Sequence, residues 1–87
     1  MSVTVELSYD MSKEYGARRI DVPDAKTVKE LLERVGTLFG ERGKDLASLS
    51  RVTAVAVNGV LINHRKGMRT KLADGDTVAF VKAAAGG

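Results

Sequence analysis

The stretch that decides the fold is "DAKTVKELLERVGTLFG", residues 24–40. Thr27 followed by Glu30 fits a capping box, in which the hydroxyl accepts from a first-turn amide and the carboxylate reaches back to another orphaned donor. Gly40 suits the left-handed residue past the last turn. The apolar residues recur at offsets of three and four, which predicts one long amphipathic helix. They are Val28, Leu31, Leu32, Val35, Leu38 and Phe39.

Two extended runs precede this helix. Residues 3–9, "VTVELSY", alternate apolar and polar side chains, the period of two that is typical of a half-buried strand. Residues 17–23, "ARRIDVP", form a second run, which Pro23 closes because proline cannot donate to a ladder. Residues 10–16, "DMSKEYG", are polar and end on a glycine, so we expect them to join the two strands as a hairpin connection. One face of the first strand would carry Val3, Val5, Leu7 and Tyr9.

The segments after the helix are shorter and rich in β-formers. Residues 41–51 have weak periodicity, so we expect a loop with a short helical turn around 46–49. Residues 52–63, "VTAVAVNGVLIN", are split into two extended pieces by Asn58-Gly59, a turn signal because both residues tolerate positive φ. These patterns predict one strand followed by a very short one.

The last strand follows a turn and completes the architecture. Asp74-Gly75-Asp76 predicts a tight turn, and Val78 and Phe80 alternate in the run that ends at Lys82. One helix with one apolar stripe and four to five strands predict an α+β fold, a mixed sheet with the main helix packed across it. Because the helix serves as a crossover, the first and last strands can pair in parallel at the sheet centre.

The order of these elements resembles a known family. Together with "AVNG" at 56–59, "LADGDTVAFV" at 72–81 and the final Gly86-Gly87, it resembles the β-grasp, ubiquitin-like sulfur carriers of the MoaD/ThiS type. That family includes the small subunit of molybdopterin synthase and the thiamine-biosynthesis sulfur carrier. The resemblance covers essentially the whole chain. It implies a β-grasp domain over residues 1–82 and a flexible C-terminal Gly-Gly tail over residues 83–87.

Composition removes several kinds of chemistry. The 87 residues include no cysteine, so disulfides, thiolate nucleophiles and cysteine metal sites are excluded. His64 is the only histidine, and no cluster of His, Asp and Glu has metal-ligand or catalytic spacing. No phosphate-binding loop motif, signal core or apolar run of about 20 residues occurs. We therefore expect a cytoplasmic protein that avoids membranes, binds no metal or cofactor itself, and is not itself an enzyme.

The reactive group that composition cannot remove is the main-chain carboxylate of Gly87. A carboxylate is a poor electrophile, so it must be activated, typically by adenylation, before a sulfur or nitrogen nucleophile attacks it. Glycine has no Cβ, so two glycines make a thin thread for a narrow channel. Residues 82–87, if extended, reach about 20 Å. The tail is therefore expected to enter a partner enzyme.

The resemblance implies a specific cycle for this tail. An ATP-dependent, ubiquitin-activating-like enzyme would adenylate Gly87, sulfur would replace AMP to give a thiocarboxylate, and a sulfur-accepting synthase subunit would use that sulfur. Gly86 would permit access. The path of the tail, where partners dock, would be lined by Phe80, Val81, Lys82, Ala83, Ala84 and Ala85.

The pathway and the use of the activated glycine stay open at this stage. Chain length is more similar to the molybdopterin synthase small subunit, but Ala83-Ala84-Ala85 replaces the prolines and serine usual there, so carriers for thiamine, cysteine or tRNA thiolation remain alternatives. The same glycine could form isopeptide bonds with lysines, as in a protein modifier. A basic module for nucleic acid or an acidic protein is a further alternative, although the net charge is only +3 and aromatic residues are not interleaved. It would use Arg18, Arg19, Arg65, Lys66, Arg69 and Lys71.

Overall fold

The computed structural model describes residues 1–51 and 53–82. The first half holds strand β1 (Ser2–Glu6), helix α1 (Tyr9–Tyr15), strand β2 (Arg19–Pro23) and the long helix α2 (Val28–Glu41). The second half holds helix α3 (Leu46–Leu49), strand β3 (Thr53–Val57), strand β4 (Val60–Leu61), the short 3-10 helices η1 (Ile62–His64) and η2 (Gly67–Arg69), and strand β5 (Thr77–Lys82).

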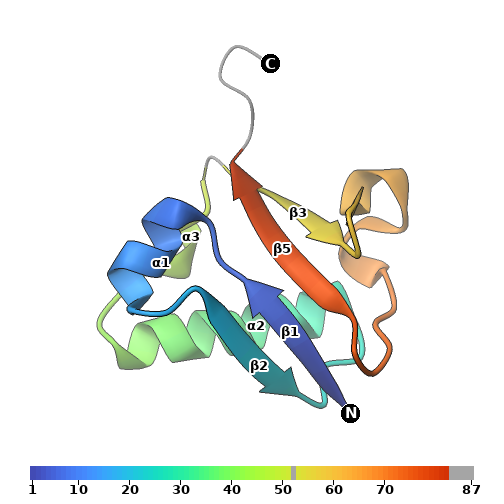
Figure 1. Ribbon diagram of the computed structural model, residues 1–87, viewed down its shortest axis with the longest axis horizontal. Coiled ribbons are helices and arrows are strands. Elements are labelled where there is room, and N and C mark those ends of the chain that lie inside the picture. The colour runs from blue at the N-terminus through green and yellow to red at the C-terminus, as the bar shows by residue number, and fades with distance from the viewer. Residues whose placement is uncertain (52, 83–87) are drawn as a thin grey trace.

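The strands form one mixed sheet in the order β2-β1-β5-β3-β4. Strands β1 and β5 pair in parallel, with Val5 opposite Val78, and the other neighbours are antiparallel. Helix α2 crosses one face of this sheet, and no helix formed by residues 1–51 and 53–82 covers the other face (Figure 1). The predicted α+β, β-grasp arrangement and its central parallel pair are confirmed. The predicted tail, 83–87, lies outside the described residues, so the division after residue 82 stays a prediction.

The hydrophobic core lies between α2 and the covered face of the sheet. Alternate residues of each strand point to this face, as the period of two requires. The side chains from α2 are its predicted apolar stripe, with Leu32 and Leu38 packed at the margin of the core. The fully buried residues include Val3, Val5, Val28, Leu31, Val35, Phe39, Val57 and Val78.

The N-terminal cap of α2 follows the prediction with one difference. The Thr27 hydroxyl accepts a hydrogen bond from the Glu30 amide at 3.2 Å, as expected for a capping box. The Glu30 carboxylate, however, accepts from the amide of Lys26, the residue before the Thr27 cap, at 2.9 Å. Both bonds satisfy donors that the first turn and its approach would otherwise leave unpaired.

The prediction for the C-terminal end of α2 was wrong. Gly40 lies within the helix, and the left-handed residue is Gly43, with φ of 72°. The Gly43 amide donates to the carbonyl of Gly40 at 3.0 Å, and the Lys44 amide donates to that of Phe39 at 2.9 Å. This pair of bonds is a Schellman motif centred three residues later than predicted.

The predicted hairpin connection is a helix. Strand β1 ends at Glu6, and the Ser8 hydroxyl accepts from the Met11 amide at 3.3 Å to cap α1. Met11 and Tyr15, four residues apart, are the buried residues of α1, whereas Tyr9 is 70% exposed. The alternating pattern therefore continues past the true end of the strand, and Tyr9 was wrongly assigned to its buried face.

Both predicted turns are confirmed, and they meet at the start of β5. Asn58 and Gly59 have positive φ, as has Gly75. The Asp76 carboxylate accepts from the Ala73 amide at 2.8 Å and from the Asn58 side-chain amide at 3.0 Å. These hydrogen bonds, with the positive charge of Arg65 adding to them, hold the pKa of Asp76 below its ordinary value.

Candidate docking site at the end of strand β5

The residues that carry the predicted tail chemistry, Gly86 and Gly87, lie outside the described residues, as do Ala83, Ala84 and Ala85. The structure describes the base from which they extend, which is the end of β5 at Lys82. A partner that receives the tail must also meet the protein surface around this base.

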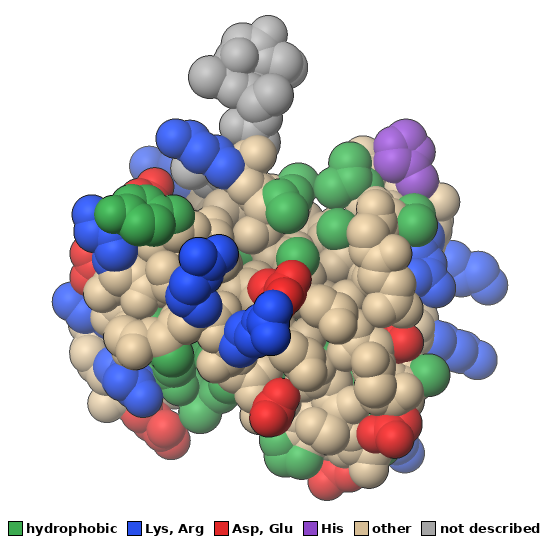
Figure 2. Space-filling view, viewed as in Figure 1, with side chains coloured by type: hydrophobic (Ala, Val, Ile, Leu, Met, Phe, Trp, Pro, Cys, Tyr) green, Lys and Arg blue, Asp and Glu red, His purple; other side chains and the backbone are tan. Residues whose placement is uncertain are grey.

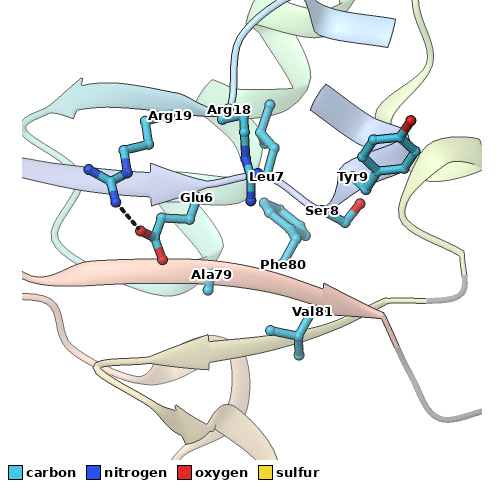
Figure 3. Close-up of a pocket in the computed structure, with 9 residues that line it drawn as sticks. All are labelled: Glu6, Leu7, Ser8, Tyr9, Arg18, Arg19, Ala79, Phe80 and Val81. Carbon is cyan, nitrogen blue, oxygen red and sulfur yellow. Dashed lines mark ion pairs between the residues drawn. The ribbon is translucent and has the colours of Figure 1, made fainter. Parts of the chain in front are cut away.

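Successive side chains at the end of β5 point to opposite faces of the sheet. Phe80 is 4% exposed and belongs to the core, whereas Val81 is 40% exposed on the other face of the sheet. Figure 3 shows the two side chains on opposite sides of the strand. Of the predicted docking residues, Val81 and Lys82 are thus accessible to a partner, and Phe80 acts as a buried support.

Strand β5 extends beyond its neighbour β1. The parallel register ends where Glu6 lies opposite Ala79, after which the chain turns away from the sheet. Among the strands that the structure describes, residues 80–82 of β5 therefore pair with β3 alone. Because β1 leaves the sheet here, no described strand pairs with the other edge of β5 at these residues.

A groove of about 750 Å³ occupies the place where β1 leaves the sheet. Its walls come from two sets of residues that are distant in the sequence, the end of β1 with the start of α1 and the second half of β5 (Figure 3). Arg18 and Arg19 complete its lining and give it positive charge, which an ion pair of 3.2 Å between Arg19 and Glu6 offsets in part. The remaining lining residues are Leu7, Ser8, Tyr9, Ala79, Phe80 and Val81.

Small apolar side chains lie beside this groove on the uncovered face of the sheet. Val81 lies opposite Ala54 in the register, and Ala79 lies opposite Ala56, which in turn lies opposite Leu61. Figure 2 looks onto this face and shows hydrophobic side chains gathered near the end of β5. We call Ala54, Leu61, Ala79 and Val81 the open-face patch. It is low and apolar, so a partner can approach the sheet closely there.

The six basic residues considered as one binding surface in the sequence are separated in the fold. Arg18 and Arg19 lie at or beside β2, one edge of the sheet, whereas Arg65, Lys66, Arg69 and Lys71 follow β4, the other edge. The predicted basic module is therefore two clusters. The first borders the groove, and the second has no part in it.

Other chemistry is not evident in the part of the chain that the structure describes. His64 is exposed, and no group of three or more His, Asp or Glu residues within 1–51 and 53–82 is arranged to hold a metal ion. No helix there is long and apolar enough to span a bilayer.

Of the open-face patch, sequence reasoning named Val81 and missed Ala54, Leu61 and Ala79. The signal was present in "TAVAV", residues 53–57, where alanines alternate with larger residues. Alternation of small and large apolar side chains gives a strand one covered face and one flat face. Which face is covered depends on the position of α2, and the strand sequence alone does not give that position.

Comparisons with known proteins agree with this architecture. A model of the ThiS family matches residues 10–87. No protein with a curated description matches the chain. A chain of the complex of subunits 1 and 2 of molybdopterin-converting factor from Helicobacter pylori is 26% identical, with a TM-score of 0.65 and full coverage of both chains.

Two further solved structures share the fold. A chain of the BexX/CysO complex from Amycolatopsis orientalis is 22% identical, with a TM-score of 0.74, 98% coverage of this chain and 99% of that one. Small archaeal modifier protein 1 from Haloferax volcanii is 20% identical, with a TM-score of 0.75, 95% coverage of this chain and 98% of that one. Since the family model matches most of its length, the chain belongs to the ThiS family of ubiquitin-like sulfur carriers.

Proposed function

We propose that this protein carries sulfur as a thiocarboxylate on Gly87 and donates it in molybdopterin-type biosynthesis. The protein acts as a co-substrate, and catalysis is performed by its partners. The observation that carries the proposal is that the family match runs through Gly86 and Gly87 to residue 87. The 26% identity to a molybdopterin-converting factor chain over the full length of both chains favours that pathway.

The proposed chemistry has two steps on the main-chain carboxylate. A carboxylate oxygen of Gly87 attacks the α-phosphorus of ATP, and pyrophosphate leaves to give an acyl-adenylate. A sulfide equivalent then attacks the acyl carbon, and AMP leaves with the bonding electrons, so a thiocarboxylate forms without a change in oxidation state. ATP and the sulfur donor are bound by the activating enzyme, and this chain supplies the acyl group.

The open-face patch and the groove supply the proposed docking surface for that enzyme. Val81 offers an apolar contact next to the tail, Arg18 offers positive charge in the groove, and Lys82 offers positive charge at the end of β5. The open edge of β5 offers backbone groups for an added strand. We expect the activating enzyme and the synthase subunit to use this same surface in turn, because both must reach Gly87.

Intact-protein mass spectrometry of the untagged chain tests the carrier chemistry. The chain is incubated with a ubiquitin-activating-like enzyme, ATP and sulfide, and the mass of one oxygen-to-sulfur exchange is expected at the C-terminal peptide. The starting mass also establishes that Gly87 bears the free carboxylate. An added residue after Gly87 should abolish the exchange. A mass gain that persists in that blocked variant would contradict the proposal.

A matched pair of variants tests the docking surface. Val81→Glu places a charge in the open-face patch, and Val60→Glu makes the same change at a similarly exposed residue, 45% against 40%, outside the patch. We expect Val81→Glu to lower the rate of adenylation at least about tenfold and Val60→Glu to leave it unchanged. Equal effects would show that the enzyme does not recognise this face.

The same experiments distinguish a protein modifier. Lysine-linked conjugates that depend on Gly87, without a detectable thiocarboxylate, would replace the carrier with a modifier. Addition of the thiocarboxylated chain to a large synthase subunit tests the pathway. Transfer of sulfur to a molybdopterin precursor is expected, and transfer only to thiamine, cysteine or tRNA acceptors would reassign the pathway and leave the carrier chemistry intact.

A further inference from the structure

A second surface of the molecule is strongly basic and lies apart from the docking site. Residues 46–73 contain five Lys or Arg residues and no Asp or Glu, although the whole chain has a net charge of only +3. Four of these five lie in or beside η1 and η2, and all four are exposed. We call Arg65, Lys66, Arg69 and Lys71, together with Met68, the η-surface. Side chains of Lys and Arg project from this side of the molecule in Figure 2.

No ion pair neutralises the positive charge of the η-surface within the described part of the chain. The ion pairs found among residues 1–51 and 53–82 are Arg19 with Glu6 and Lys44 with Glu14, and neither involves this surface. The Arg65 charge acts on Asp76 without forming an ion pair with it. Arg65, Lys66 and Lys71 line a hollow of about 310 Å³ together with Thr70. Like charges held together in this way favour an anionic partner.

The backbone under the η-surface is held in place by a buried residue. Thr70 is 2% exposed, and its hydroxyl accepts from the Lys66 amide at 3.2 Å and donates to the Gly67 carbonyl at 2.7 Å. The Thr70 carbonyl accepts from the Val28 amide at 3.1 Å, which ties this segment to the start of α2. The basic side chains thus extend from a preorganised base, which lowers the entropy cost of binding.

One apolar side chain, that of Met68, indicates which kind of anionic partner the η-surface suits. Met68 is 44% exposed in η2, between Lys66 and Arg69 in the sequence. A flexible thioether among cations suits a protein segment that has an apolar residue flanked by carboxylates. A nucleic-acid backbone offers only its small sugar carbons to Met68, and residues 46–73 contain no Phe, Tyr or Trp on which bases could stack.

From these observations we propose that the η-surface docks an acidic protein segment with an apolar anchor residue. The η-surface ends at Lys71, shortly before the turn that leads into the start of β5, whereas the tail leaves from the other end of that strand at Lys82. The six residues of β5 span about 20 Å. The η-surface therefore lies beyond the edge strand β4, away from the end of β5 where the tail leaves, and an acidic partner can hold the protein while the tail end is engaged elsewhere.

Nuclear magnetic resonance titration of the full chain with synthetic peptides tests this proposal. The probe is a seven-residue peptide of Glu and Asp with one central leucine, and the control peptide has serine in place of leucine. We expect amide shifts confined to the segment around η1 and η2, and weaker binding of the serine peptide. Shifts centred on Arg18 and Arg19 instead would overturn the assignment.

Two sets of variants separate specific docking from general charge attraction. Lys66→Glu with Arg69→Glu should weaken binding of the leucine peptide at least about tenfold, whereas Lys13→Glu with Arg18→Glu, the same change of charge beside α1, should weaken it far less. Met68→Ala should remove the advantage of leucine over serine. Equal losses from both charge reversals, or an unchanged preference for leucine in Met68→Ala, would refute the proposal.

A nucleic-acid partner is the competing outcome. A duplex DNA of about 20 base pairs is titrated under the same conditions at about 150 mM salt. Tighter binding of the duplex than of the leucine peptide, sensitive to Lys66→Glu with Arg69→Glu and insensitive to Met68→Ala, would replace the acidic protein with nucleic acid. Correct folding of each variant is verified by its amide spectrum, which should change only near the substituted residues.

Discussion

The two faces of the sheet differ in the size and burial of their side chains. The face against α2 carries large residues such as Val5, Val78 and Phe80, all buried. The other face carries threonines, alanines and charged residues, with Val81 as its exposed apolar member near the tail. Strand β5 contributes to both faces in alternation. Stability therefore depends on the covered face, whereas the proposed docking uses the open face, so substitutions should separate the two properties.

The largest expected effect concerns the covered side. Phe39 is fully buried on α2, and its ring centroid lies 4.8 Å from that of Tyr15. Phe39→Ala removes this contact and leaves a cavity, so we expect the free energy of unfolding to fall by about 3 to 5 kcal/mol. Urea denaturation followed by circular dichroism measures it. A loss below about 1 kcal/mol would mean that the core does not depend on this ring.

A matched pair of substitutions compares the two faces within one strand. Val78 is fully buried on the covered face and Val81 is 40% exposed on the open face. Val78→Ala should cost about 2 kcal/mol of stability, since two methyl groups leave the core, and Val81→Ala should cost less than about 0.5 kcal/mol. The order should reverse for binding of the activating enzyme, measured by titration calorimetry. Comparable stability losses from Val78→Ala and Val81→Ala would show that the two faces contribute equally to stability.

The start of β5 is expected to respond to pH. The folded pKa of Asp76 is lowered, so its contribution is present above the unfolded pKa and is lost as pH falls through the folded pKa. Asp76→Ala removes two hydrogen bonds and should cost about 1 to 2 kcal/mol at neutral pH. The difference from the unsubstituted chain should narrow below about pH 4 in thermal melts. A stability difference that did not change with pH would mean that the ionised form of the Asp76 carboxylate is not responsible for the stabilisation.

Two glycines at the end of α2 should give effects of opposite sign. Gly43 has φ of 72°, so Gly43→Ala should destabilise by about 1 kcal/mol. Gly40 lies inside the helix with open space where a Cβ would stand, so Gly40→Ala should stabilise by about 0.5 to 1 kcal/mol. Both changes lie on the covered side and should leave sulfur transfer unaffected. If Gly40→Ala destabilised the protein instead, Gly40 and not Gly43 would be the glycine that ends the helix.

The sequence predicted those parts of the fold that depend on long or unambiguous patterns. The apolar stripe of α2, the Asn58-Gly59 turn and the turn at Asp74-Gly75-Asp76 were correctly placed because each depends on local physical rules. Helix α1 was missed because its seven residues are too few to show a clear helical periodicity. Its signals were Ser8 as a cap, Met11 and Tyr15 four apart, and a glycine just beyond.

At the candidate docking site, the sequence located the end of β5 but not the groove beside it. The run that ends at Lys82 identified the base of the tail, whereas the groove depends on where β1 leaves the sheet. That point is set by the Ser8 cap, which diverts the chain into α1. The partners of Val81 on the open face come from β3 and its register, which residue patterns in one strand do not reveal.

The central parallel pair has a consequence for the order of folding. Thr4 pairs with Thr77, so the middle of the sheet joins segments from nearly opposite ends of the chain. Contacts of such large sequence separation form late and slow the folding of mixed domains. The groove has one wall from β1 and another from β5, so it exists only after this late step. A partner enzyme that recognises the groove would therefore act on fully folded chains and pass over incomplete ones.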